Sequence, residues 1–110
     1  MHKGFKINCV TKKVELIEIS DLKDMQNAVG GYIESALDFK ENALYVNEEG
    51  LLDNSPILNG FKFEGGQDFY AGNGLFLGID YATGESKDCT LIAEEIESKV
   101  SFRSLIRGIA

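Results

Sequence analysis

The chain has 110 residues, of which 44% are hydrophobic and 26% charged, and its formal net charge is −7 at pH 7. This length fits a single domain, residues 1–110, with the composition of an ordinary globular protein. The excess of carboxylates disfavours general nucleic-acid binding, because an acidic surface repels phosphate backbones. The acids are scattered rather than grouped in long runs, so DNA mimicry is the less favoured alternative.

The N-terminus and the two cysteines indicate the cellular compartment in which the protein is expected to reside. Residues 1–6 carry charge but no apolar segment, which does not fit a signal peptide. No run approaches the roughly 18 consecutive apolar residues of a membrane span. Cys9 and Cys89 lack C-x-x-C spacing and are too few for a disulfide framework. We therefore expect two buried reduced thiols, a cytoplasmic location and no membrane contact.

Two short β-type runs open the chain, at residues 5–10 and 14–19, with three residues between them. A connection of this length predicts a β-hairpin. In the second run apolar residues lie on both faces, which indicates a strand that is covered on both sides. The lysine pair in the turn is expected to be solvated.

A short helix is predicted over residues 22–29. Ser20 is a suitable N-cap, and Asp24 lies in the first turn, where the helix dipole favours negative charge. Gly30 ends the helix, because a glycine adopts a positive φ without a Cβ clash. Gly31 then allows a sharp turn into the next strand.

Alternating apolar and polar residues predict strands over residues 32–39 and 43–46, with a turn at 40–42. Residues 47–50, Asn-Glu-Glu-Gly, have the composition of a β-turn with Asn first and Gly last. Residues 51–52 then begin a third strand or a short return.

Residues 53–67 are the least regular stretch, with the one proline of the chain and two glycine-containing turns. Segments of this length without regular structure are usually functional or partly mobile. The alternation of Phe61 and Phe63 around Lys62 adds a short edge strand to this stretch.

Residues 75–81 have the pattern of a strand with apolar side chains on both faces. The Asn73-Gly74 pair before it is ordinarily a strong hairpin signal. The end of the chain is predicted to be helical from Asp88 or Thr90 onward. The apolar stripe changes phase near Ser101, so the segment after it either continues the helix or forms a short strand.

The order of elements is therefore β-β-α-β-β, an irregular segment, then a strand and a helix. Strands joined by short turns predict an α+β fold. We expect a mainly antiparallel sheet, a short helix in the N-terminal half and a C-terminal helix packed to one side.

Some of these segments resemble a known family. Residues 29–34, Val-Gly-Gly-Tyr-Ile-Glu, residues 44–51, Leu-Tyr-Val-Asn-Glu-Glu-Gly-Leu, and the segment 72–85 are similar to the DUF3846-like family of domains of unknown function. The likeness covers most of residues 6–98 and departs at 54–60, where the family tends to carry a compact Leu-Pro-x-Asn. The resemblance implies one α+β domain, an origin in phages, prophages or other mobile elements, and the cytoplasm of a bacterial host. It implies no catalytic residue.

Side chains for common catalytic mechanisms are scarce. The one histidine is His2, near the terminus, which excludes a histidine-based triad and a multi-histidine metal site. The glycines within 72–78 only approximate a dinucleotide fingerprint, and β-type residues follow them instead of a helix. Glu48, Glu49 and Asp53 are the best carboxylates for Mg²⁺, but acids beside a turn are far more often solvated. We expect no enzyme activity, no cofactor and no metal site.

The sequence supports a ligand-binding role better than a catalytic one, because polar residues lie in its glycine-flanked loops. Amides and aromatic faces suit a nucleobase or ribose, and arginines can meet a phosphate. Each of these residues also has a structural explanation, in a turn, in a sheet or on a solvated surface. The candidate ligand-binding residues are Tyr32, Asn47, Glu48, Asn59, Tyr70, Asn73, Arg103 and Arg107.

Two functions from different classes follow. The first is a non-enzymatic accessory protein of a phage or mobile element that binds a small nucleotide-like ligand, for example to sequester a host immune signal in anti-defence. The second is a protein-interaction module that inhibits or redirects a host protein through an acidic face or the C-terminal apolar stripe. A homodimer is compatible with either function. A domain this small still exposes roughly a third of the surface of its unfolded chain, and a dimer would bury more of it.

Overall fold

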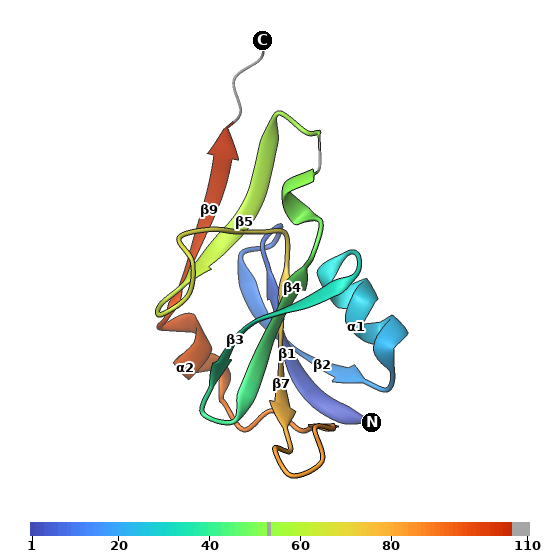
Figure 1. The fold of residues 1–110 in the computed structure, drawn as a ribbon. Coiled ribbons are helices and arrows are strands. Elements are labelled where there is room, and N and C mark those ends of the chain that lie inside the picture. The colour runs from blue at the N-terminus through green and yellow to red at the C-terminus, as the bar shows by residue number, and fades with distance from the viewer. Residues whose placement is uncertain (53, 107–110) are drawn as a thin grey trace.

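The structure, a computed structural model, describes residues 1–52 and 54–106, and Figure 1 shows antiparallel sheets and two short α-helices in this part of the chain. The larger sheet has the order β2-β1-β7-β4-β3, with β8 paired to β7, and the smaller has the order β6-β5-β9. The mainly antiparallel α+β fold is therefore confirmed. The elements are β1 (His2–Asn8), β2 (Lys13–Ile19), α1 (Leu22–Val29), β3 (Ile33–Phe39), β4 (Asn42–Asn47), η1 (Gly50–Leu52), β5 (Ile57–Phe63), β6 (Tyr70–Ala71), β7 (Gly74–Ile79), β8 (Ser86–Lys87), α2 (Ala93–Glu97) and β9 (Val100–Ile106).

The larger sheet is covered on both faces, because side chains of its central strands alternate between two hydrophobic clusters. On β7, Phe76 belongs to one cluster with Phe63 of the smaller sheet, while Leu75 and Leu77 belong to the other with Met25 of α1. All three β7 side chains are fully buried. The smaller sheet and α2 contribute to the first cluster and α1 to the second, so the helices do not share one layer.

Helix α1 has the predicted bounds, but its N-cap is Asp21 and not Ser20. The Asp21 carboxylate accepts a hydrogen bond from the Asp24 N–H at 2.9 Å, and the Asp24 carboxylate accepts one from the Ser20 N–H at 2.8 Å. The first of these bonds makes Asp21 the cap, one residue later than predicted, and the second holds the residue before it, while both carboxylates suit the positive end of the helix dipole. At the other end Gly30 has a φ of 87°, as the sequence predicts.

The hairpin between β3 and β4 is closed by two non-glycine residues in left-handed backbone. Lys40 and Glu41 have φ angles of 49° and 62°, as a two-residue type I′ turn requires. The Asn42 amide supports this turn by donating to the carbonyls of Phe39 and Lys40 at 3.3 and 2.8 Å. Asn42 also donates to Thr90 Oγ1 at 2.9 Å and accepts from the Thr90 N–H at 3.0 Å, so this fully buried residue ties the turn to the segment before α2.

The stretch predicted as irregular, residues 53–67, contains a regular strand. β5 pairs with β9 along its whole length, and at Gly60 and Phe61 it also pairs with β6. It is therefore the central strand of the smaller sheet, and the prediction of an edge strand was wrong. The sequence pattern did not show this because β9, the strand that completes the pairing, lies far along the chain. The predicted metal candidate Asp53 lies outside the described residues.

The Asn73-Gly74 pair does not join a hairpin, since β6 and β7 belong to different sheets. The Asn73 side chain accepts a hydrogen bond from the Cys9 N–H at 2.9 Å and donates to the Ala28 carbonyl at 3.3 Å. These bonds to distant segments hold the chain where it passes from one sheet to the other. Tertiary contacts thus override the local turn preference of this dipeptide.

The C-terminal helix is much shorter than predicted. α2 ends at Glu97, and the chain continues as β9, so the strand alternative for this segment is confirmed. Val100 and Phe102 alternate toward the core, where they lie opposite Phe63 and Phe61 of β5. Cross-strand pairs of this kind stabilise a sheet, and they bury side chains that a continued helix would not place together.

We expect Asn42→Ala to lower the free energy of unfolding by about 3 kcal/mol, because each buried polar group left without a partner costs roughly 1–3 kcal/mol. The exposed Asn54 provides the control, and Asn54→Ala should change the stability by less than about 0.5 kcal/mol. Urea denaturation of both variants measures the difference. An Asn42→Ala variant as stable as the wild type would contradict this role.

Candidate functional site

A cleft of about 950 Å³ lies between the C-terminal end of α1, the turn after β4, and strands β5 and β6. Figure 1 shows the ribbons that border it, with α1 on one side and η1 and β5 on the other. Its volume falls within the range of roughly 300–1,000 Å³ that is usual for ligand pockets. Its described lining residues are Gln26, Asn27, Gly30, Gly31, Tyr32, Asn47, Glu49, Gly50, Ser55, Ile57, Leu58, Asn59, Ala71 and Gly72.

Glycines allow the segments around the cleft to approach one another closely. A Cβ on Gly31 would lie 2.8 Å from Asn47 Oδ1, and a Cβ on Gly50 would lie 2.8 Å from the Ala71 carbonyl oxygen. Both distances are shorter than real Cβ contacts, so a side chain at position 50 would push the Ala71 backbone away, and one at position 31 would displace the Asn47 side chain. The walls of the cleft therefore depend on backbone at these two positions.

The Asn47 side chain connects the end of α1 to the turn after β4. Its Nδ2 donates to the Gly30 carbonyl at 3.3 Å, and its Oδ1 accepts from the Glu49 N–H at 2.9 Å. The N–H groups of Gly30 and Gly31 both donate to the Gln26 carbonyl, at 2.8 and 3.0 Å, which closes the helix end. The Asn47 amide is thus held in place as part of the wall.

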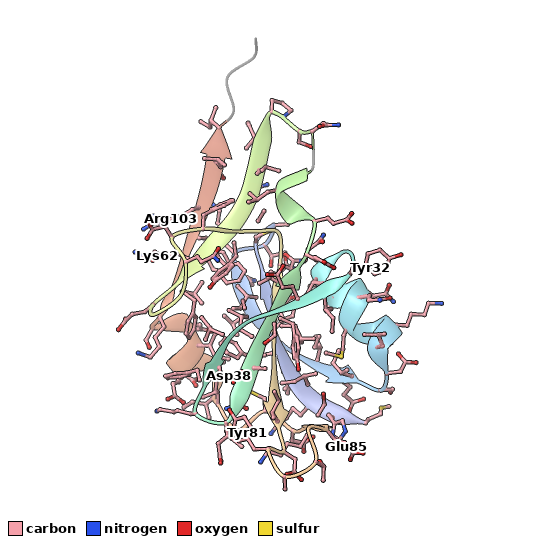
Figure 2. All side chains as sticks on the ribbon, in the orientation of Figure 1. Tyr32, Asp38, Lys62, Tyr81, Glu85 and Arg103 are labelled. Atoms are coloured by element: carbon pink, nitrogen blue, oxygen red, sulfur yellow. The ribbon has the colours of Figure 1, made fainter. Side chains whose placement is uncertain are left out.

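Tyr32 and Asn59 line the cleft from separate elements. Tyr32 is 64% exposed and lies beside the end of α1 in Figure 2, and its carbonyl accepts from the Glu48 N–H at 2.8 Å. Asn59 is on β5, where its Oδ1 accepts from Ser104 Oγ at 2.8 Å, and no described residue accepts from its Nδ2. One aromatic ring and one amide with spare donors therefore face the same cleft as Asn47.

Three other candidate residues are not brought into the cleft. Glu48 is exposed beside it but is not part of its lining. Tyr70 is buried in the core, and its hydroxyl accepts from the Gln67 N–H at 2.9 Å. Asn73 uses its amide in the two long-range hydrogen bonds described above. Tyr70 and Asn73 thus have the structural roles that the sequence left as the alternative.

Arg103 lies on β9 and lines a different groove, of about 390 Å³. Figure 2 shows Arg103 and Lys62 close together, across the molecule from Tyr32. Lys62 in that groove is within 3.5 Å of the Asp68 carboxylate. Arg107 lies outside the described residues. The predicted phosphate contact from an arginine is therefore not provided to the cleft by any residue that the structure describes.

The electrostatics of the cleft favour an uncharged or cationic ligand group. Glu49 is the one ionisable carboxylate among the described lining residues, and these include no lysine, arginine or histidine. The C-terminal end of α1 has no basic residue in its last turn, so the negative end of the helix dipole is not offset there. An anion inside the cleft would have no described cationic partner, which makes its desolvation costly.

Sequence analysis did not single out Gln26 and Asn27, which add two amides to the cleft from the last turn of α1. Their side chains make no hydrogen bond with other described residues. A usable signal was present, because both are polar residues in the last turn of the helix, before the glycine pair that ends it. Glu49, considered only as a metal ligand, also lines the cleft.

Neither a metal-ligating cluster nor an exposed thiol is present among the residues that the structure describes. No group of three His, Cys, Asp or Glu side chains within residues 1–52 and 54–106 could hold a metal ion. Cys9 and Cys89 are free and buried, as predicted, and burial raises the pKa of both thiols above the usual value. The described part of the chain has no helix long and apolar enough to cross a bilayer.

Comparison with known proteins identifies a family but no close relative. The family model described as Domain of unknown function (DUF3846) matches residues 6–101, which is most of the chain. Neither the search of curated proteins nor the search of solved structures gave a match. The matched segment contains the whole cleft lining.

We expect both native thiols to resist alkylation at about pH 8, where the denatured chain reacts readily, since an unperturbed cysteine has a pKa of about 8.5. Because folding raises both pKa values, the stability that they contribute is complete below the pKa of the unfolded thiols and is lost as the pH rises above it. Mass spectrometry after iodoacetamide treatment measures the reaction. The variant Ser101→Cys, exposed on β9, is the positive control, and rapid labelling of Cys9 or Cys89 in folded protein would refute the assignment.

Proposed function

We propose that this chain, which belongs to the DUF3846 family of domains of unknown function, is a non-enzymatic protein that binds a small polar ligand in the cleft beside Tyr32 and Asn47. The observation that supports this function is the convergence of amide side chains from α1, β4 and β5 on one cleft of about 950 Å³. These segments are distant in sequence, and each presents a hydrogen-bonding group there.

The chemistry of the lining suits a nucleoside-like ligand. An amide offers a donor and an acceptor side by side, which matches the edge of a nucleobase, and hydroxyl groups of a ribose can pair with the same groups. The Tyr32 ring provides a face on which a base can stack. Because the described lining has no cation, the phosphates of a nucleotide would extend toward solvent rather than into the cleft.

Sequestering such a ligand is the role we favour. The sequence resembles domains found in phages and other mobile elements, whose hosts use nucleotide-derived signals in defence. A protein that holds the signal without converting it needs a cleft and a high affinity but no nucleophile. The amides, the phenol and the single carboxylate among the described lining residues are adequate for binding and offer no paired nucleophile and base.

A protein-interaction module that inhibits or redirects a host protein is the second candidate function. It is favoured by the apolar residues that remain exposed at the end of β5 and β9, namely Ile57, Leu105 and Ile106. The two functions differ most clearly at Ile106 on β9, which does not line the cleft, whereas Ile57 does. Loss of a defined partner with Ile106→Asp, but not with Tyr32→Ala, would favour the interaction module.

A thermal and chemical denaturation screen with nucleosides, cyclic dinucleotides and ADP-ribose tests ligand binding. A ligand present at one hundred times its Kd should raise the free energy of unfolding by about 2.7 kcal/mol. Among ligands that share a base, removal of the phosphate should cost little affinity, because the cleft provides no phosphate partner. The absence of any stabilisation at millimolar ligand would argue against the function.

Substitution of a cleft residue tests whether the ligand binds in the cleft. Tyr32→Ala should weaken binding by about 5- to 150-fold, since stacking of a base on an aromatic ring is worth about 1–3 kcal/mol. Tyr81→Ala is the matched control, because Tyr81 is exposed to a similar extent, 57%, and does not line the cleft. Equal binding by Tyr32→Ala and wild type, measured by calorimetry, would place the ligand elsewhere.

A further inference from the structure

Strand β9 has an unpaired edge. It forms one end of the smaller sheet, and all seven of its residues pair with β5 in a continuous register. No described strand pairs with its other edge. Figure 1 shows β9 and β5 extending together beyond the larger sheet, so this edge is also away from the body of the protein.

The other long edges of the two sheets carry features that discourage pairing, and β9 does not. β3 has an irregularity in its register between Ser35 and Leu37, and it carries the exposed carboxylates of Glu34 and Asp38. Strand β2 carries a lysine and two glutamates. β9 has no proline, no bulge and Arg103 as its one charged residue. Proteins normally protect an edge strand with such features, so their absence indicates a partner.

The hydrogen-bond pattern shows which groups of β9 point outward. The Glu64 N–H donates to the Lys99 carbonyl at 3.0 Å, so residues 64 and 99 face each other as a hydrogen-bonded pair. Such pairs alternate along an antiparallel ladder, and the odd-numbered residues of β9 therefore bond to β5. On the far side of β5, the Gly72 N–H donates to the Asn59 carbonyl, which fits the same alternation. The backbone groups of Phe102, Ser104 and Ile106 accordingly point away from β5.

The same edge carries an exposed apolar end and a groove lined by both apolar and charged residues. Ile106 is 76% exposed and is the most exposed apolar side chain of β9. A groove of about 420 Å³ lies beside Val100 and Phe102, with Val14 also in its lining and Lys12, Lys13 and Glu97 completing it. Side chains of Phe102 and Ile106 share one face of the strand, because residues four apart in a strand point the same way.

We propose that β9 pairs in an antiparallel manner with β9 of a second copy of this chain, about a two-fold axis at Ser104. In this register Phe102 lies opposite the partner's Ile106, and the reverse contact forms at the same time, as an isologous interface requires. The exposed isoleucine of each copy thereby reaches the groove beside Phe102 of the other. The two three-stranded sheets become one continuous sheet.

Charge selects this register over its neighbour. A shift by one step, with Phe102 opposite the partner's Ser104, would place Arg103 directly opposite the partner's Arg103, and like charges in that position destabilise a strand pair. With the axis at Ser104, Arg103 lies opposite the partner's Leu105 instead. The acids of the exposed sheet edges, such as Glu15 and Glu34, are on the larger sheet and not on this line of contact. The proposal does not depend on the ligand, because β9 does not line the cleft.

Light scattering coupled to gel filtration tests the proposal on the full chain, with circular dichroism to confirm folding. The wild type should elute with twice the mass of one chain, and Ser104→Pro should elute as a folded monomer because it removes an outward N–H without breaking a backbone hydrogen bond to β5; its loss of the side-chain bond to Asn59 is shared by Ser104→Ala. Ser104→Ala, which keeps that N–H, should remain a dimer. Ile106→Asp should also be monomeric, while Leu16→Asp, at a 60% exposed residue of β2, should stay dimeric.

Disulfide trapping tests the register. Ser104→Cys should form a covalent dimer under mild oxidation, since facing residues of a hydrogen-bonded pair have Cα atoms about 5.5 Å apart. Ser101→Cys on the same strand does not face itself and should form far less. A monomeric wild type, a dimer that Ser104→Pro and Ile106→Asp both leave intact, or equal trapping of the two cysteine variants would each overturn the proposal.

Discussion

The contact between the backbone of Gly31 and the side chain of Asn47 determines how the rest of the candidate site is arranged. The Asn47 side chain can lie against the helix end because position 31 has no Cβ, which would otherwise be 2.8 Å from Asn47 Oδ1. Asn47 then bonds to both sides of the junction, at the Gly30 carbonyl and the Glu49 N–H. The end of α1 and the turn after β4 therefore form one wall, and β5 supplies the wall that faces it.

The larger sheet lies between two other layers, the smaller sheet with α2 on one face and α1 on the other. This arrangement explains why the wall of the cleft can be polar. Packing of β7 between the two hydrophobic clusters supplies the buried apolar surface that the fold needs, with Phe76 on one side and Leu75 and Leu77 on the other. The cleft lies at the end of these layers, where segments meet through hydrogen bonds. Amide side chains at such a place cost little stability and remain available to a ligand.

The local sequence pattern predicted those features of the fold that depend on residues close together in the chain. The helix over residues 22–29 and its end at Gly30 follow from spacing and from the backbone freedom of glycine, and Tyr32 and Asn47 were named separately as polar residues of the glycine-flanked loops. What depended on distant segments was predicted wrongly or was left open between two alternatives. Asn73 has the sequence of a turn but is held by Cys9 and Ala28, and β9 becomes a strand because it pairs with β5. Arg103 follows β9 to another groove for the same reason.

The most direct test of the ligand-binding account is a titration of ¹⁵N-labelled protein with a nucleoside, followed by amide chemical shifts. The account predicts that the amides of Gly31, Gly50, Asn59 and Gly72 shift together and saturate with one affinity, because these residues line one cleft. Shifts confined to the groove of Lys62 and Arg103 would contradict it, and so would the absence of any shift at millimolar nucleoside.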